Sequence, residues 1–549
     1  MARRRRHLGI NEPLRHADHA RPVTRREFIR QGFLTGAGMT MGGGVFSLFS
    51  NPRAAYAAVS GDLDALALDI GCSLGGLSGT KKIPFICFDL AGGANLAGSN
   101  VLVGQGGGQT DFLSTAGYSK LGLPGDMIPG LSQANFTGSL LNTSADTDFI
   151  NSQLGLKFHA DSPMLAGILE KTNLALTQGG VNGCVLPARS DNDTGNNPHN
   201  PMYGIAAAGG NGGVVSLIGS RSSDSGGNSM SPSIFMNAEI RPTKVDRPSD
   251  VTGMVDVGNL TGILNDPADV TAVMESMARL THKKMSKVNT NVAADAVIKD
   301  LVRCGYLKAA DIAERFAGVE VSPDDRNATT PVIIGPNPEH IFTAAEFDSD
   351  SEFRKTASVM KMVIDGHAGS GCITMGGYDY HTGDRQTGEN RDLRAGRCIG
   401  ACLEYAAQMG QPVMIYVYSD GSLASNGNID NSQPSGNNEL GGRGKGQWTG
   451  DNSSTACSFF LVYDPTGAIP IYNNDAPELR QQIGRFSADG SVVTSSSPAA
   501  NNVNLLVNTV ILNYMALHGE QAGFSALFNS GNHGLGNIDT SIAFGQIAP

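Results

Sequence analysis

The sequence predicts an α/β protein, a three-layer sandwich around a mostly parallel sheet. Apolar runs of strand length, such as residues 83–90 and 413–418, alternate with amphipathic helices, such as residues 351–366 and 391–410. Apart from Asp89, the two runs are apolar, and they are rich in β-branched residues, which is typical of strands buried on both faces of a parallel sheet. Alternating strands and helices favour layers of helices on both sides of one sheet.

The expected elements occur along most of the chain. In chain order they are a strand at residues 83–90, a helix at 163–170, a strand at 174–177, a polar helical region at 266–318, a helix at 351–366, a strand at 372–375, a helix at 391–410, strands at 413–418 and 459–463, and a helix at 503–518. Clusters rich in Gly and Asn between them indicate long loops on a globular scaffold. Residues 58–549 are therefore expected to form one α/β domain with a helical insertion near 266–318.

The first 57 residues predict an export signal. Ten Arg lie in this segment, and residues 24–30 read Thr-Arg-Arg-Glu-Phe-Ile-Arg, which resembles the twin-arginine consensus. A weakly apolar stretch follows at residues 32–49, and Ala-Tyr-Ala at residues 55–57 has the form of a signal-peptidase site. A basic nucleic-acid arm or a membrane anchor accounts for the arginines but not for this ordered series. We expect the twin-arginine translocase as a partner during export and a periplasmic or extracellular protein, with the signal either cleaved or kept as an anchor.

The chain after the signal is acidic and contains every cysteine. Ten of the 40 basic and three of the 51 acidic residues lie in the predicted signal. Residues 58–549 therefore contain 30 basic and 48 acidic residues, which give a formal net charge of −18. Such a chain without a basic cluster is a poor partner for nucleic acid, and no later apolar run is long enough to span a membrane. The eight Cys permit disulfides in an oxidising compartment, but their spacing shows no zinc pattern and leaves the pairing open. Cys398 and Cys402 fall on the apolar stripe of the helix at 391–410 and are expected in the core.

Acidic residues end or follow three of the expected strands. Asp89 lies at the end of the first strand, Asp379 and His381 follow the strand at 372–375, and Asp420 follows the strand at 413–418. The carboxyl ends of parallel strands share one edge of the sheet, where ligands bind. Carboxylates with an imidazole suit a divalent cation that activates water or steadies a phosphoryl or sulfuryl oxygen. The alternative is that each Asp caps a turn or a helix.

Four short motifs resemble a known family. They are Phe-Asp-Leu-Ala-Gly-Gly at residues 88–93, Leu-Lys-Phe-His-Ala-Asp-Ser-Pro-Met-Leu at 156–165, Gly-Gly-Tyr-Asp-Tyr-His at 376–381 and Tyr-Ser-Asp-Gly-Ser-Leu-Ala-Ser-Asn-Gly at 418–427. With the signal, they resemble the exported family called domain of unknown function 1501, which is similar to the alkaline phosphatase and sulfatase superfamily. The resemblance spans about residues 80–470 and implies an alkaline-phosphatase-like fold. The function of that family is itself poorly defined.

The resemblance implies a metal site with several ligands missing. Asp89 matches a first-strand ligand, Asp379 and His381 match a Gly-Gly-aromatic-Asp-Thr-His segment, and Asp420 matches the Asp of Ser-Asp-Phe-Gly-Arg. Tyr380 stands in place of the Thr, no Arg follows Asp420, and the segment at 451–453, Asp-Asn-Ser, replaces Asp-His-Gly. Since a two-metal site needs more imidazole and carboxylate ligands, the set supports at most one ion, calcium or magnesium in preference to zinc.

A further loop contains candidate catalytic residues. Arg189, Ser190 and His199 resemble the Arg-Ser-His loop of the family, stretched by an insertion. The candidate nucleophiles are Ser190 and Thr194, with His199 beside them, and the alternative is that these hydroxyls make loop hydrogen bonds. Residues 184–189, Cys-Val-Leu-Pro-Ala-Arg, are similar to the sulfatase Cys-x-Pro-Ser-Arg motif, but the Pro is one position late and Ala188 replaces the Ser.

Two functions follow from these patterns. One is a metal-dependent phosphate or sulfate ester hydrolase with a degenerate site, and the other is a non-catalytic structural or carbohydrate-binding protein of the cell envelope on the same fold. Redox proteins also use twin-arginine export, but no haem, flavin or iron–sulfur motif occurs here. The sequence leaves open the substrate, the oligomeric state and whether the protein is an enzyme.

Overall fold

The computed structural model describes most of the chain after residue 58. The described residues are 59–72, 82–142, 147–173, 176–190, 197–255, 264, 266–316, 319–328, 332–335, 341–467 and 469–548. The predicted export signal at 1–57 and the candidate nucleophile Thr194 lie outside them. The chain divides into two compact units. We call Ala58–Cys72 with Gly253–Val319 the helical unit, and Ser73–Thr252 with Glu320–Pro549 the sheet unit.

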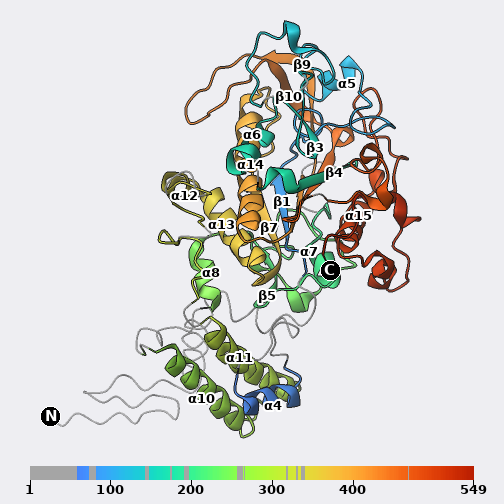
Figure 1. The fold of residues 1–549 in the computed structure, drawn as a ribbon. Coiled ribbons are helices and arrows are strands. Elements are labelled where there is room, and N and C mark those ends of the chain that lie inside the picture. Colours follow the sequence, from blue (N-terminus) through green and yellow to red (C-terminus); the bar gives the residue numbers. More distant parts are fainter. Residues whose placement is uncertain are drawn as a thin grey trace, which may run out of the picture. The chain divides into compact units, whose positions relative to one another are not determined.

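A seven-stranded sheet forms the centre of the sheet unit, in the order β4-β11-β8-β1-β7-β5-β6 (Figure 1). Its strands are β1 (Phe85–Ala91), β4 (Val181–Pro187), β5 (Val215–Gly219), β6 (Thr243–Lys244), β7 (Ala368–Gly376), β8 (Val413–Tyr418) and β11 (Cys457–Tyr463). The strands β8, β1, β7, β5 and β6 are parallel to one another, and β11 pairs antiparallel with both β8 and β4. The predicted mostly parallel sheet is therefore confirmed, with one strand of opposite direction.

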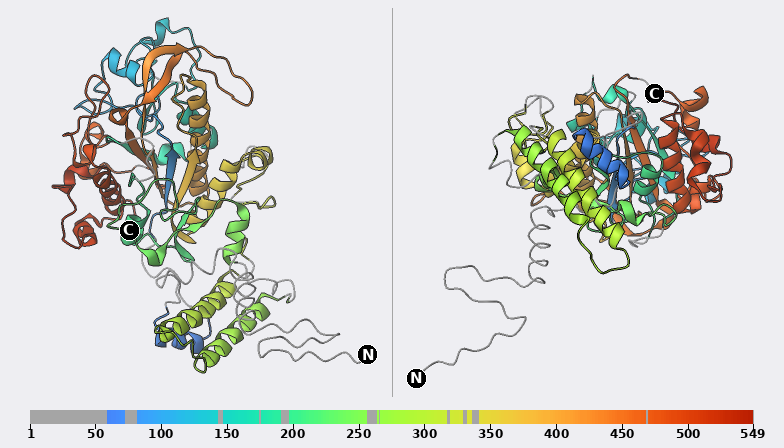
Figure 2. Two further views of the ribbon diagram at one scale, coloured as in Figure 1. Left: turned by 180° about the vertical axis from the view of Figure 1, so that it is seen from behind. Right: turned by 90° about the horizontal axis from the view of Figure 1, so that it is seen from below.

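Helices cover both faces of this sheet. The helices α13 (Ser351–Ile364) and α14 (Gln386–Gln408) lie on one face, and α7 (Met202–Ala207) and α15 (Val503–Ala516) lie on the other (Figures 1 and 2). The central strands are buried along their whole length because both faces are covered. Alternate strand residues such as Phe85, Tyr416 and Phe460 belong to the core that contains α15. This arrangement is the predicted three-layer α/β sandwich.

Glycines bring α6 (Pro163–Lys171) close to α14. A Cβ at Gly167 would lie 2.3 Å from the Leu393 carbonyl oxygen, and a Cβ at Gly396 would lie 2.0 Å from the Met164 carbonyl oxygen. The side chain of Ser162 begins α6 by accepting a hydrogen bond from the Leu165 N–H at 3.1 Å. The two helices therefore pack backbone against backbone.

Smaller elements surround the sheet unit. The hairpin of β9 (Leu423–Asp430) and β10 (Lys445–Asp451) and the pair β2 (Ile150–Leu154) and β3 (Leu156–His159) are antiparallel. The remaining short helices are α5 (Thr115–Lys120), α8 (Pro248–Val255), which reaches the boundary of the units, and α12 (Ala344–Ser349).

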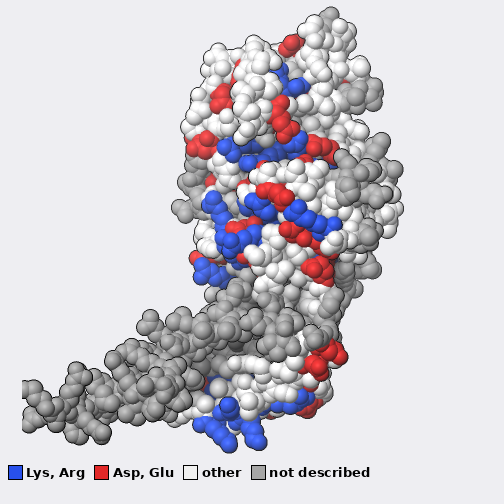
Figure 3. All heavy atoms as spheres, turned by 90° about the vertical axis from the view of Figure 1, so that its left-hand side faces the viewer, with Lys and Arg blue, Asp and Glu red and all other residues white. Residues whose placement is uncertain are grey.

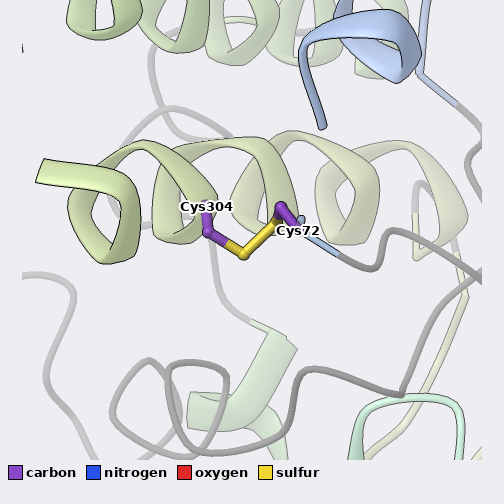
Figure 4. The surroundings of a disulfide bond; sticks show 2 residues. All are labelled: Cys72 and Cys304. Atoms are coloured by element: carbon purple, nitrogen blue, oxygen red, sulfur yellow. A yellow bond between two sulfur atoms is a disulfide. The ribbon is translucent and has the colours of Figure 1, made fainter. Parts of the chain in front are cut away.

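The helical unit consists of α4 (Gly61–Asp69), α10 (Pro267–Met285) and α11 (Asp295–Arg315). A disulfide joins Cys72 to Cys304, with a Cα–Cα distance of 5.4 Å (Figure 4). It connects the residues after α4 to the middle of α11 across 232 residues of sequence. The side chain of Arg279 on α10 also pairs with Asp62 on α4. Covalent and ionic contacts thus hold α4 against the two long helices.

Some expected elements differ from the observed ones. The expected strand at 174–177 is wrong for its described part, because residues 176–177 form a turn. The strand follows at Val181–Pro187, where Gly183 and Pro187 weaken the strand pattern. The expected helical region at 266–318 contains two helices, α10 and α11. Cys398 and Cys402 are fully buried, which confirms their expected place in the core.

The surface over α12, α13 and α14 carries charges of both signs. Figure 3 shows Lys and Arg side chains intermixed with Asp and Glu side chains on this face, and several form ion pairs, such as Arg397 with Glu439 and Arg326 with Asp348. Among the described residues, no helix is both long enough and apolar enough to cross a membrane.

Candidate metal centre

The strand ends bring four predicted site residues to one edge of the sheet. Asp89 lies within β1, Asp379 and His381 follow β7, and Asp420 follows β8. Asp89 is in register with Thr374 of β7 and with Tyr418 of β8. Because β1 lies between β7 and β8 in the sheet, the loops that carry the four residues leave the sheet side by side.

Asp379, His381 and Asp451 form a cluster that could hold a metal ion. His381 Nε2 lies 2.6 Å from Asp379 Oδ1 and 3.7 Å from Asp451 Oδ1. One ligand atom from each residue lies within 4.8 Å of the others. The side chains of His381 and Asp451 are each 36% exposed and that of Asp379 is 52% exposed. The cluster is therefore open to solvent, and a cation bound there would keep water ligands.

Close backbone contacts position Asp379. Gly92 follows β1 with φ at +128°, and a Cβ at this residue would lie 2.4 Å from the Asp379 backbone nitrogen. The N–H of Tyr378 donates to the Ala91 carbonyl at 3.1 Å. The loop after β7 therefore packs directly on the loop after β1, which only a glycine at position 92 permits.

The hairpin β9–β10 brings Asp451 to the same place. Asp451 ends β10 opposite Leu423 of β9, and the next N–H, that of Asn452, donates to the Ser422 carbonyl at 2.8 Å. Since β9 starts five residues after β8 ends, the hairpin extends the β8 strand end outward. In the sequence, Asp451 stands out only because the residue after it is Asn452 and not His. It is not a predicted ligand, because no local pattern indicates β10.

Asp89 is fully buried, and its carboxylate is already hydrogen-bonded. Its Oδ2 accepts from the backbone N–H groups of Asn228 at 2.6 Å and Ser229 at 2.8 Å, and the Ser229 hydroxyl lies 3.3 Å from Oδ1. Burial raises the pKa of Asp89 to about 6, against the opposing effect of these donors. The negative charge of Asp420 also raises it.

Asp420 is linked to Asp89 through Asn228. Its Oδ1 accepts from the Gly92 N–H at 2.9 Å, and its Oδ2 accepts from Asn228 Nδ2 at 3.1 Å. Burial raises the pKa of Asp420, and the Asp379 carboxylate adds to this increase. Asp89 and Asp420 thus both accept hydrogen bonds from Asn228, Asp89 from its backbone N–H and Asp420 from its side-chain amide. The residues Asn228 and Ser229 carried no sequence signal, since they lie in a Gly/Ser-rich loop without a recognisable motif.

Ser190 and His199 form a buried pair next to Asp420. Ser190 Oγ lies 2.8 Å from His199 Nε2 and donates to the Asp420 carbonyl oxygen at 2.8 Å. With the hydroxyl hydrogen used in this way, Nε2 is the donor in the neutral ring. The His199 ring stacks on Tyr418, and its Nδ1 has no hydrogen-bond partner among the described residues. Burial lowers the pKa of His199 to about 3. These bonds tie the loop to the end of β8, and a catalytic role for Ser190, Thr194 or His199 stays a prediction.

Tyr380, between Asp379 and His381 in the chain, is buried beside α14. Its side chain is 2% exposed, and a Cβ at Gly388 would lie 3.2 Å from its Cζ. Burial raises the pKa of Tyr380 well above the usual range. The side chain therefore points away from the exposed cluster formed by its two neighbours and anchors the loop in the core.

A buried ion network supports the hairpin that carries Asp451. Lys445, the first residue of β10, binds Glu389 of α14 at 2.7 Å and Asp161 at 3.1 Å. Arg385 binds the same Glu389 at 2.7 Å and lies over the Trp448 ring. Although burial opposes ionisation, Lys445 and Arg443 lower the pKa of Asp161 to about 2. The network fixes β10 on α14 through charges that are shielded from water.

No family model, no curated protein and no solved structure matches this chain.

Proposed function

We propose that this protein binds one divalent cation at Asp379, His381 and Asp451 and uses it to hydrolyse a phosphate or sulfate ester outside the cytoplasm. The proposal includes export through the twin-arginine translocase and a fold related to the alkaline phosphatase and sulfatase superfamily. The observation that carries it is the approach of two carboxylates and one imidazole, from β7 and β10, to within 4.8 Å.

The donor atoms of the cluster fit a hard cation. Carboxylate oxygens are preferred by calcium and magnesium, and one imidazole is compatible with either ion and with manganese or zinc. Two carboxylates neutralise a divalent charge, and the exposure of all three residues leaves room for water and for a substrate oxygen. When bound, such a cation would lower the pKa of a water ligand and polarise a phosphoryl or sulfuryl oxygen.

The surrounding residues would orient the cluster rather than ligate the cation. Asp89 and Asp420 are buried and accept hydrogen bonds from Asn228, Ser229 and Gly92, so their oxygens face donors already. When these two carboxylates are ionised, their negative charge near the cluster favours a bound cation. Water is the proposed nucleophile, because Ser190 donates its hydrogen to a backbone carbonyl.

Metal binding and turnover test this proposal together. Purified protein is freed of metal and titrated with magnesium, calcium, manganese and zinc by calorimetry, and then assayed with aryl phosphate and aryl sulfate esters. We expect one equivalent of cation to bind, and Asp379→Asn and Asp451→Asn each to weaken binding and kcat/KM by at least ~100-fold. The matched control is Asp348→Asn, an exposed acid on α12 that pairs with Arg326, which is expected to leave both quantities unchanged.

The second candidate is a non-catalytic cell-envelope protein on the same fold. The buried residues Asp89, Asp420 and Ser190 favour this candidate. Their polar groups already form hydrogen bonds within the protein, as expected of residues that stabilise the fold. In this case the cation would order the loops for binding a carbohydrate or another envelope component. Stoichiometric cation binding without turnover of any ester supports this candidate, and metal-dependent turnover rules it out.

A further inference from the structure

The helix α10 in the helical unit has two apolar stripes. One stripe, with Val270, Met274 and Ala278, is buried within the unit. The other is turned outward: Met277 is 39% exposed and Leu280 is 52% exposed. A helix whose second apolar stripe is left uncovered offers a surface for a partner.

The outer stripe lines a hollow of about 400 Å³. Its lining residues are Leu264, Asp269, Ala272, Val273, Ser276, Met277 and Leu280. At 100° of turn per residue, Val273, Ser276, Met277 and Leu280 fall within about one third of the helix circumference. The hollow therefore follows the length of the helix and does not enter the core of the unit.

Charges of opposite sign stand at the two ends of this stripe. Asp266 and Asp269 precede it, and Lys284 and Lys287 follow it, all of them exposed. Asp266, Asp269 and Lys284 lie on the same side of the helix as the stripe, given 3.6 residues per turn, and Lys287 lies in the turn that follows the helix. Among the described residues, none of the four is in an ion pair within 4.0 Å. The stripe is thus acidic at its beginning and basic at its end. In an antiparallel pair of such helices, the acidic end of each helix lies beside the basic end of the other.

We propose that α10 pairs antiparallel with α10 of a second copy of this chain. A twofold axis between Ser276 and Met277 sets the register, and this register opposes Asp269 to Lys284 and Val273 to Leu280 in both directions. An isologous contact of this kind is self-complementary and closes as a dimer. The antiparallel helix dipoles are also favourable.

The contact is modest in size. Nineteen residues give a helix about 28 Å long, which buries less than the roughly 1,600 Å² of a standard protein interface. The pair therefore forms a reversible dimer with a dissociation constant on the order of micromolar. A lipid surface fits the outer stripe less well, because its acidic end would face the anionic headgroups.

Sedimentation of the purified chain over a concentration series tests the dimer, with Met277→Asp as the disrupting variant and Leu68→Asp as the matched control. Leu68 is an apolar residue 77% exposed on α4 of the same unit. We expect a monomer–dimer equilibrium that Met277→Asp weakens at least ~10-fold and Leu68→Asp leaves unchanged. A monomer throughout the series overturns the proposal, as does a dimer that persists in Met277→Asp. A monomer that sediments with anionic vesicles assigns the stripe to a lipid surface instead.

Charge reversal tests the register. Asp269→Lys and Lys284→Glu each place like charges opposite one another and are expected to weaken the dimer, whereas the double variant restores both pairs and the affinity. Failure of the double variant to recover overturns the antiparallel register.

An engineered cysteine near the axis provides an independent readout. Ser276→Cys places a thiol of each copy beside the twofold axis, offset by one residue from its counterpart, and is expected to form a disulfide-linked dimer under mild oxidation. The control is Ser286→Cys, at the end of the same helix but off the stripe, which is expected to remain monomeric. The six other free cysteines are buried, so they do not compete. Equal crosslinking of both variants overturns the assignment.

Discussion

Lys445 Nζ lies 2.7 Å from Glu389 Oε2, and both side chains are fully buried. Lys445 begins β10 and Asp451 ends it, so this ion pair and the exposed metal cluster lie at opposite ends of one short strand. The ion pair fixes β10 on α14, and the strand carries Asp451 to the end of β7. A buried structural interaction therefore determines where an exposed candidate ligand lies.

Replacing Lys445 by Met is expected to lower the free energy of unfolding by at most about 3–5 kcal/mol. Glu389 and Asp161 each lose one of two cationic partners in a buried site, and they keep Arg385 and Arg443 respectively. Urea unfolding measures this change. The control is Arg326→Met, which removes the half-exposed ion pair with Asp348 and is expected to cost less than about 1 kcal/mol. If Lys445→Met lowers the free energy of unfolding by less than the control does, the ion network does not stabilise the hairpin.

Replacing Gly92 by Ala is expected to abolish cation binding at the cluster. The added Cβ would lie 2.4 Å from the Asp379 nitrogen, at a φ of +128°, and the loop after β7 must shift. The matched control is Gly376→Ala at the end of β7, where an added Cβ meets no atom within 4 Å. Calorimetric titration of both variants checks the prediction, and equal affinities in the two would contradict it.

The buried Asp392 gives the stability of the fold a specific pH dependence. Burial raises its pKa to about 7, although Asn100 donates to it at 2.7 Å and opposes the increase. The folded state keeps a proton here that the unfolded state releases. The free energy of unfolding therefore falls between about pH 4 and pH 7, by at most ~1.4 kcal/mol per pH unit from this group.

The variant Asp392→Asn lacks this proton and removes the corresponding part of the pH dependence. Its stability relative to the unmodified protein is expected to rise steadily as the pH increases through that window. Urea-unfolding series at several pH values measure the difference. Two parallel pH profiles would show that Asp392 does not titrate in this range.

Breaking the Cys72–Cys304 disulfide is expected to destabilise the helical unit. The Cys304→Ser variant loses a crosslink that spans 232 residues, and such losses typically cost 2–5 kcal/mol. Hydrogen exchange followed by mass spectrometry localises the effect. We expect faster exchange in α4 and α11 and unchanged exchange in β1 and β8. Faster exchange in the central strands instead would mean that the disulfide also supports the sheet unit.

The central strands and the long helices could be predicted from the sequence because their apolar pattern is continuous. The strand at 413–418 was predicted with its observed bounds, Val413–Tyr418. The strand β4 was missed because Gly183 and Pro187 interrupt its pattern, and β5 and the hairpin β9–β10 were missed because Gly, Ser and Asn dominate their surroundings. The direction of a strand in the sheet could not be predicted from local patterns either. A fully buried strand such as β11 has the same apolar sequence pattern whether it is parallel or antiparallel to its neighbours.

The candidate site was predicted only in part. The strand-end rule pointed to Asp379 and His381, and these two lie 2.6 Å apart. Asp451 depends on a hairpin that local patterns did not indicate. Asp89 and Asp420 have the positions of ligands, but their hydrogen bonds to Asn228 and Ser229 come from a loop about 140 and 190 residues away in sequence, and no spacing rule predicts such a contact.

The most direct test of the central claim is a crystal structure of the protein soaked in manganese, with anomalous diffraction locating the ion. One anomalous peak is expected within coordinating distance of Asp379, His381 and Asp451, about 2.0–2.6 Å from the ligand atoms, and it is expected to disappear in Asp451→Asn. A protein that binds no ion there, or that binds it between Asp89 and Asp420, does not have the proposed metal site.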